Sequence, residues 1–178
     1  MEVALWILAG LVGLIVLFAL AGFVAGLTQP KDHTASRGLL LKQTPEAIWA
    51  VITDYAKEPE WQPHSESVTK LDDRNGNEAW MHKHKGRGNP PMILVTTEKV
   101  VPTRLVRTID DTKQMFTGRW EFALTPADGG TRLTITEHGE IKNPFFRGMF
   151  RMFASPHTYI DMYLKALAGK FGEPANIT

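Results

Sequence analysis

The N-terminus of the chain is an uncharged apolar segment, and no other feature limits the possible folds so strongly. Residues 3–27 read VALWILAGLVGLIVLFALAGFVAGL, and no charged residue follows Glu2 until Lys31. At about 1.5 Å per residue, a helix of this length reaches roughly 37 Å, enough to cross a hydrocarbon core of about 30 Å. A buried core helix of that length would need a polar face, and this segment has none. We therefore predict a transmembrane anchor over residues 1–28 and a linker over residues 29–35.

A cleaved signal peptide is the alternative interpretation of this segment. Ala19-Leu20-Ala21 has the small residues of a cleavage site. However, the residues before the apolar run include Glu2 and no Lys or Arg, and the run is longer than the roughly 7–15 residues of a signal-peptide core. We therefore favour an anchor that stays attached. Gly22 and Gly26 have the spacing of packed helices, but a glycine-rich segment shows that spacing by chance, and we predict no dimer from it.

The charges that flank the apolar segment predict its orientation. Lys31, Arg37 and Lys42 follow it, whereas only the α-amine precedes it. Positive charge is enriched on the cytoplasmic side of membrane spans. We expect a single-pass membrane protein that contacts the lipid bilayer through Val3–Leu27 and carries its remaining residues in the cytoplasm.

The composition of the remaining residues indicates one near-neutral domain. The 178 residues include 20 Lys and Arg, 19 Asp and Glu, and no Cys. A balance this close to zero argues against nucleic acid as a partner, because phosphate binding usually requires a strongly basic surface. The absence of cysteine excludes disulfides, thiolate metal sites and a thiol nucleophile. No zinc motif such as HExxH occurs either, so we predict no metal and no cofactor.

The hydrophobic pattern predicts an α+β domain. Thr44 followed by Pro45 is typical of a helix start, and Asn75-Gly76 is typical of a tight hairpin turn. Alternating apolar residues indicate strands at 33–42, 68–71, 78–85, 92–101, 105–109, 117–125 and 131–141. Apolar residues at steps of three and four then indicate helices over 145–153 and 156–171. We expect a curved antiparallel seven-stranded sheet wrapped around a long C-terminal helix.

Several motifs, in the order of these elements, resemble the START-like superfamily called SRPBCC. They are TPEAIW at Thr44–Trp49 with Thr53-Asp54 and Trp61-Gln62-Pro63, then Leu124-Thr125-Pro126 with Gly130–Thr134, and finally Tyr163–Leu167. This superfamily includes polyketide cyclases and dehydrases, coenzyme Q-binding proteins and birch-pollen-allergen-like proteins. The resemblance implies a helix-grip domain over residues 36–173, a tail over 174–178, and a hydrophobic cavity between the sheet and the long helix. It implies no catalytic motif.

The candidate binding residues are those that the pattern turns toward this cavity. Alternation places His82 and His84 on one face with a tryptophan, and Glu137 on one face with two aliphatic residues. A buried carboxylate needs a partner, and we expect Glu137 to pair with Arg107, either to orient a polar ligand group or as a structural ion pair. The predicted lining is Trp61, Trp80, His82, His84, Leu105, Arg107, Trp120, Phe122, Leu133, Ile135, Glu137, Phe153, His157, Ile160 and Leu164.

Three functions remain open at this point. The first is membrane-anchored binding of a hydrophobic small molecule, such as a lipid, a quinone or a polyketide-like compound. The second is a cyclase or dehydrase that uses His82, His84 and Glu137 as acid–base groups. The third is an interaction module whose cavity is filled by its own side chains.

A second segment is a candidate for contact with the bilayer. Phe145–Phe153 is rich in aromatic residues and methionine, and it carries Arg147 and Arg151 one helical turn apart. Such a segment can lie in a lipid interface with its arginines at the head groups. Ordinary packing beneath the sheet is the alternative.

Overall fold

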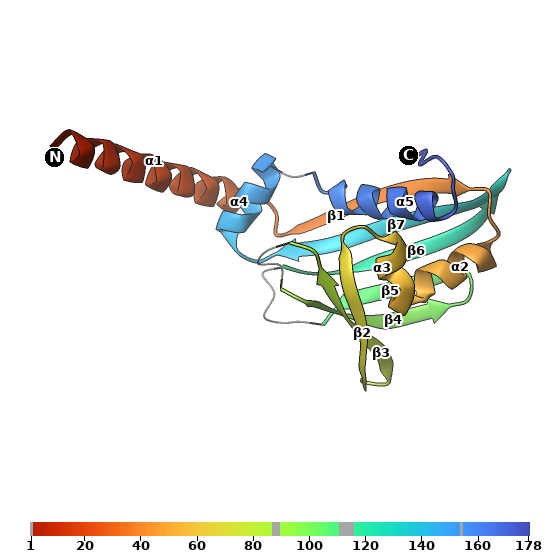
Figure 1. Cartoon of the computed structure of the whole chain (residues 1–178). Coiled ribbons are helices and arrows are strands. Elements are labelled where there is room, and N and C mark those ends of the chain that lie inside the picture. Colours follow the sequence, from red (N-terminus) through yellow and green to blue (C-terminus); the bar gives the residue numbers. More distant parts are fainter. Residues whose placement is uncertain (1, 87–89, 111–115, 154) are drawn as a thin grey trace.

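A seven-stranded antiparallel sheet forms the centre of the molecule (Figure 1). The computed structural model describes residues 2–86, 90–110, 116–153 and 155–178. The strands are β1 (Asp32–Leu41), β2 (Ser65–Arg74), β3 (Asn77–His84), β4 (Met92–Val100), β5 (Arg104–Ile109), β6 (Phe116–Ala127) and β7 (Gly130–Ile141). Their order in the sheet is β1-β7-β6-β5-β4-β3-β2. The strands after β2 therefore form a meander, and β1 closes it by pairing with the last strand.

In the described residues, six helical segments accompany the sheet. They are α1 (Glu2–Leu27), α2 (Pro45–Thr53), the 3-10 turn η1 (Tyr55–Lys57), α3 (Glu58–Trp61), α4 (Pro144–Phe153) and α5 (Thr158–Lys170). Thr44 caps α2, because its Oγ1 accepts a hydrogen bond of 3.3 Å from the Ala47 amide. The predicted helix start is therefore confirmed.

The turn and edge residues explain where the sheet agrees with the sequence pattern and where it differs. Asn75 and Gly76 form the turn between β2 and β3 with positive φ angles of 53° and 80°, as predicted. β2 is longer than the predicted residues 68–71, since it begins at Ser65 and ends at Arg74. As an edge strand it carries mostly exposed, polar side chains, so no alternation marks its ends.

The core lies between the sheet and the helices α2 and α5. Leu39 of β1, Leu133 and Ile135 of β7, and Ile160 and Leu164 of α5 are all fully buried there. Burying such side chains contributes roughly 1.5–3 kcal/mol each. The domain is thus an α+β helix-grip-like fold, a seven-stranded antiparallel sheet with C-terminal helices.

The two ends of the chain differ in how they join this core. The C-terminal residues return to β1, where Thr178 exchanges backbone hydrogen bonds with Gly38. At the other end, β1 already pairs with β7 at Asp32, so few residues separate the sheet from α1. α1 projects away from the sheet, and α4 crosses its C-terminal end (Figure 1).

α1 is a candidate membrane span by its length and composition. It has 26 residues, and its most apolar window is 0 % buried. A signal sequence near the N-terminus can meet the same criteria of length and apolar composition. We therefore argue membrane attachment below as part of the proposed function.

Candidate functional site

A cluster of ionisable side chains is buried beside this apolar core. It consists of Glu58, His82 and Arg107, which are 7 %, 2 % and 6 % exposed, and we call it the buried polar cluster. His82 Nδ1 lies 3.3 Å from Glu58 Oε1, and Arg107 Nη2 lies 2.7 Å from His82 Nε2. Arg107 Nη1 is also 4.0 Å from Glu58 Oε2. The three side chains therefore form a closed group of one carboxylate, one imidazole and one guanidinium.

The fold brings these residues together from three separate elements. His82 lies on β3 and Arg107 on β5, the two strands that flank β4. Glu58 begins α3, directly after η1, and the following Pro59 suits the first turn of a helix because it needs no amide partner. The Glu58 carbonyl accepts the Gln62 amide at 2.9 Å, which closes this single turn. The short helix thus holds a carboxylate over the sheet.

The hydrogen bonds fix the tautomer of His82. A guanidinium only donates hydrogen bonds, so His82 Nε2 must accept from Arg107 through its lone pair. The ring proton therefore sits on Nδ1, which donates to the carboxylate of Glu58. Both ring nitrogens of His82 are occupied in this arrangement.

The pKa shifts agree with this assignment. Burial lowers the pKa of His82, and the positive charge of Arg107 lowers it further, although Glu58 acts in the opposite direction. Burial alone would raise the pKa of Glu58, but the hydrogen bond from His82 and the positive charge of Arg107 make the net shift downward. At neutral pH the cluster therefore holds an ionised carboxylate, a neutral imidazole and a guanidinium cation.

Two tyrosines and a threonine border the buried polar cluster. The Arg107 guanidinium carbon lies 4.0 Å from the centre of the Tyr55 ring, a cation–π contact. The Tyr55 hydroxyl lies 3.3 Å from Thr96 Oγ1. Tyr163 of α5 is buried nearby, and burial raises its pKa well above the ordinary value, so it stays neutral.

Three buried polar atoms in this region have no hydrogen-bond partner among the described residues. They are Gln62 Oε1, Ser65 Oγ and Arg107 Nε. Gln62 and Ser65 follow Glu58 closely, and the Ser65 amide donates to the Gln62 carbonyl at 3.0 Å. Buried polar groups normally bind a partner, so these atoms offer free hydrogen-bonding capacity to a water molecule or to a polar group of a ligand.

Residues 39–158 match the family model described as polyketide cyclase/dehydrase and lipid transport. The chain belongs to this family. The matched residues contain the whole buried polar cluster, because Glu58, His82 and Arg107 lie between these limits. The match also confirms the resemblance to the START-like SRPBCC superfamily that the sequence motifs indicated.

Solved structures show the same fold at low sequence identity. A START superfamily protein from Mycobacterium smegmatis has a TM-score of 0.61 at 16 % identity, over 78 % of this chain and 96 % of its own. The Zhui aromatase/cyclase from Streptomyces sp. R1128 has a TM-score of 0.63 at 13 % identity, over 78 % and 93 %. Ara h 8.0201 has a TM-score of 0.57 at 15 % identity, over 78 % and 97 %. A comparison with curated protein sequences finds no match.

Most of the predicted lining residues of this family member do face the interior. Tyr163 is the centre of an aromatic group, with ring centroids of Trp61, Trp120 and Phe122 at 5.3, 5.8 and 5.6 Å. Leu105, Leu133, Ile135, Ile160 and Leu164 are fully buried around it. Trp80 packs edge-on against Tyr55 at 5.3 Å. Side chains therefore occupy the space between the sheet and α5 in this structure.

The expected pair between Glu137 and Arg107 does not form. Glu137 instead lies 3.3 Å from His33 Nε2 across the β1–β7 pairing, while Arg107 belongs to the buried polar cluster. The Glu137 carboxylate thus finds its partner on the neighbouring strand β1. That partner was missed because His33 lies 104 residues away in sequence.

Three other predicted residues lie near the interior or outside it. His84 is half-buried, and burial, together with the nearby His64, lowers its pKa. His157 is at the start of α5, and its Nδ1 has no hydrogen-bond partner among the described residues. Phe153 differs from the prediction, because it is on α4, largely exposed, with its ring centroid 6.2 Å from that of Phe18 in α1. α4 ends at Phe153 and α5 begins at Thr158, so the two helices are separate, as predicted, and Phe153 does not share the buried face of α5.

Glu58, Tyr55 and Tyr163 were not among the predicted site residues. Tyr55 and Tyr163 lie on apolar helix faces, and a tyrosine there is indistinguishable from a core residue. Glu58 lies in a four-residue helix, which is too short to show periodicity. Across the described ranges, no three His, Asp or Glu residues are placed to hold a metal ion.

Proposed function

We propose that this protein binds a hydrophobic small molecule between its sheet and α5, and that the buried polar cluster holds the polar end of that molecule. A lipid, a quinone or a polyketide-like compound has the required combination of an apolar body and a polar end. The observation that carries the proposal is the buried group of Glu58, His82 and Arg107 beside the apolar core.

A role in ligand binding explains the buried polar cluster better than a role in stabilising the fold. A buried ion pair costs much of its attraction in desolvation, and apolar replacements of such pairs are often as stable. Arg107 Nε, Gln62 Oε1 and Ser65 Oγ also have no partner among the described residues. A ligand oxygen beside Arg107 would accept a hydrogen bond from the unpartnered Nε.

The aromatic side chains define where the apolar part of the ligand would lie. Trp61 and Trp120 are only partly buried, whereas Phe122, which contacts Trp120, is buried. A ligand that enters between them would displace ring contacts with Tyr163 and replace them with its own. The packed interior is then the ligand-free state of the site.

We also propose that α1 anchors the protein in a membrane with the domain in the cytoplasm. α1 is long enough to span and its apolar side chains are exposed. α4 packs against its end and exposes further aromatic residues, so both helices would contact lipid. An anchored binding protein meets a membrane-dissolved ligand at high effective concentration.

An enzymatic cyclase or dehydrase activity has less support from the geometry. Both nitrogens of His82 are engaged, which leaves no free base at that position. Glu137 is on β7, and its carboxylate is paired with His33 of β1 rather than with His82. His82 and Glu137 thus belong to separate groups of contacts, whereas acid–base catalysis requires two groups at one reacting atom.

The test is to identify the compounds that co-purify with the full chain in detergent. Wild type, Arg107→Met and Arg104→Met are extracted with organic solvent and compared by mass spectrometry. Arg104 is the matched control, because it lies on the same strand but is exposed and paired with Glu98. We expect one apolar compound in near-stoichiometric amount with wild type and Arg104→Met, and at least tenfold less of it with Arg107→Met.

Two results would contradict the proposal. Extracts that contain only bulk lipids, in equal amount for all three proteins, would favour an interaction module with a filled interior. A compound retained equally by Arg107→Met would show that the buried polar cluster does not hold the ligand.

A further inference from the structure

The C-terminal end of α1 packs directly against α4 through glycines. Gly22 and Gly26 are the buried residues of α1. A Cβ atom at Gly148 would lie 1.9 Å from the Gly22 carbonyl oxygen, and one at Gly26 would lie 1.7 Å from the Pro144 carbonyl oxygen. The two backbones are therefore in contact, as in helix pairs within membranes, where small residues permit close approach.

This packing sets the depth of α4 relative to the candidate span. Pro144 lies beside Gly26, and Phe153 contacts Phe18. α4 therefore runs antiparallel to the last third of α1 and packs against it. Phe146, Met152 and Phe153 are 40 %, 50 % and 68 % exposed on α4. With α1 in the bilayer, as proposed above, α4 lies in the leaflet where α1 ends and turns these side chains toward acyl chains.

Arg147 closes the junction between the two helices. Its Nε donates to the Gly26 carbonyl at 2.8 Å, and its Nη1 donates to the Ile141 carbonyl at 2.9 Å. A cation at this position also opposes the partial negative charge at the end of α1. These partners are neutral, and no carboxylate in the described part of the chain is paired with Arg147. A net positive charge is thus built into the end of the span.

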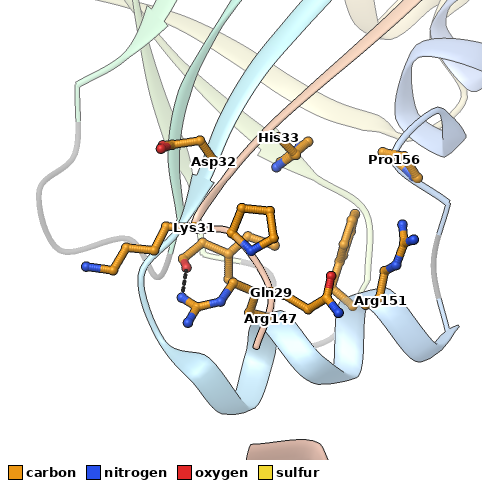
Figure 2. Close-up of a pocket in the computed structure, with 10 residues that line it drawn as sticks. Gln29, Lys31, Asp32, His33, Arg147, Arg151 and Pro156 are labelled. Atoms are coloured by element: carbon orange, nitrogen blue, oxygen red, sulfur yellow. Dashed lines mark hydrogen bonds between the residues drawn. The ribbon is translucent and has the colours of Figure 1, made fainter. Parts of the chain in front are cut away.

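A hollow of about 100 Å³ opens beside this buried arginine (Figure 2). Lys31 and Arg147 lie on one side of it and Arg151 on the other, with Asp32 the one carboxylate in its lining. Its apolar lining comes from Pro30, Ile141, Phe150 and Pro156. The hollow therefore combines three cations and one anion with apolar walls, at the level where α1 leaves the membrane.

We propose that this hollow binds the phosphate head group of an anionic phospholipid from the leaflet in which α1 ends. Basic pockets beside a span on the cytoplasmic side suit anionic head groups, and each Lys or Arg near the surface contributes to the attraction. The apolar walls and the exposed aromatic side chains of α4 give the acyl chains a path away from the phosphate. A soluble phosphate ion would make no use of these surfaces. The site is separate from the buried polar cluster.

The test uses the full chain, purified in detergent and depleted of lipid. Its midpoint of thermal unfolding, Tm, is measured with added phosphatidylglycerol, phosphatidylcholine or inorganic phosphate. A ligand that binds the folded state raises Tm in proportion to its occupancy. We expect phosphatidylglycerol to raise Tm and the other two probes to have little effect.

Variants localise the effect to the hollow. Arg151→Gln and Lys31→Gln should each weaken the apparent affinity for phosphatidylglycerol roughly fivefold, the loss expected for one basic residue near a membrane surface. Lys165→Gln, an exposed site on α5, is the control and should leave it unchanged. Arg151 and Lys31 are exposed, so their variants should unfold at the wild-type Tm without lipid.

Each contrary result has a distinct meaning. Equal stabilisation by phosphatidylcholine, or unchanged affinity in Arg151→Gln, overturns the head-group site alone. Stabilisation by inorganic phosphate alone replaces the lipid with a soluble anion. Failure of the full chain to enter phosphatidylcholine nanodiscs would overturn the anchor and this site together, whereas the interior ligand is tested separately by Arg107→Met.

Discussion

Removing the carboxylate of Glu58 tests the energetic coupling inside the buried polar cluster. Glu58→Leu would leave the Arg107 cation buried without an anion, and the side chains of both residues are at most 10 % exposed, so solvent screens them little. Breaking one side of such a pair costs about 3–5 kcal/mol, whereas replacing both partners with apolar residues is often neutral. We therefore expect the double variant Glu58→Leu/Arg107→Met to lose several kcal/mol less of its free energy of unfolding than the two single variants lose together.

The assay is thermal unfolding of the full chain in detergent, followed by tryptophan fluorescence. For a chain of this size, each kcal/mol shifts Tm by about 2–4 °C, so Glu58→Leu should lower it by roughly 6–20 °C. The control cycle uses Glu98→Leu and Arg104→Met, an exposed pair on the same sheet at 2.9 Å, whose coupling should stay below about 1 kcal/mol. The reasoning is refuted if Glu58→Leu costs less than 1 kcal/mol, or if the effects of Glu58→Leu and Arg107→Met simply add.

Two further predictions concern pH and the contact between α1 and α4. Burial lowers the pKa values of His82 and His84 in the folded chain. As the pH falls through about 6.5, these two histidines therefore bind protons in the unfolded chain but stay neutral in the folded chain. Their contribution to stability is complete above that pH and is lost as the pH falls, so Tm should decrease from pH 7.5 to 5.5, and a flat profile would contradict the shifts. Gly148→Ala should separate α4 from α1 and speed hydrogen exchange of the α4 amides, while Gly13→Ala, where a Cβ meets open space, should not. Equal exchange in both variants would show that the glycine contact does not hold α4.

The strands and turns were predictable because their signals are local. Alternation and turn residues located the strands after the first helix, and Asn75-Gly76 marked a turn that the positive φ angles confirm. The ends of β2 were not predictable, since this edge strand carries mostly exposed, polar side chains and therefore shows no apolar alternation at its ends. The fold class followed from the order of these elements.

The site was less predictable because its contacts join distant segments. The alternating pattern correctly predicted that His82 and Arg107 face the interior, but it could not predict which carboxylate contacts them. That carboxylate is Glu58, in a single helical turn that has no periodic signal. Glu137, which we predicted to pair with Arg107, contacts His33 in the structure, and this contact depends on the register of β1 against β7.

The location of the bound ligand is the most direct test of the proposed function. The full chain in detergent is irradiated with a diazirine-bearing fatty acid, and the modified peptides are mapped by mass spectrometry. We expect adducts on the interior-facing residues of β5, β6 and α5, such as Leu105, Phe122 and Tyr163, with fewer adducts in Arg107→Met than in Arg104→Met. Adducts confined to α1 and α4 would contradict an interior binding site, because the apolar probe would then contact only the membrane-facing surface.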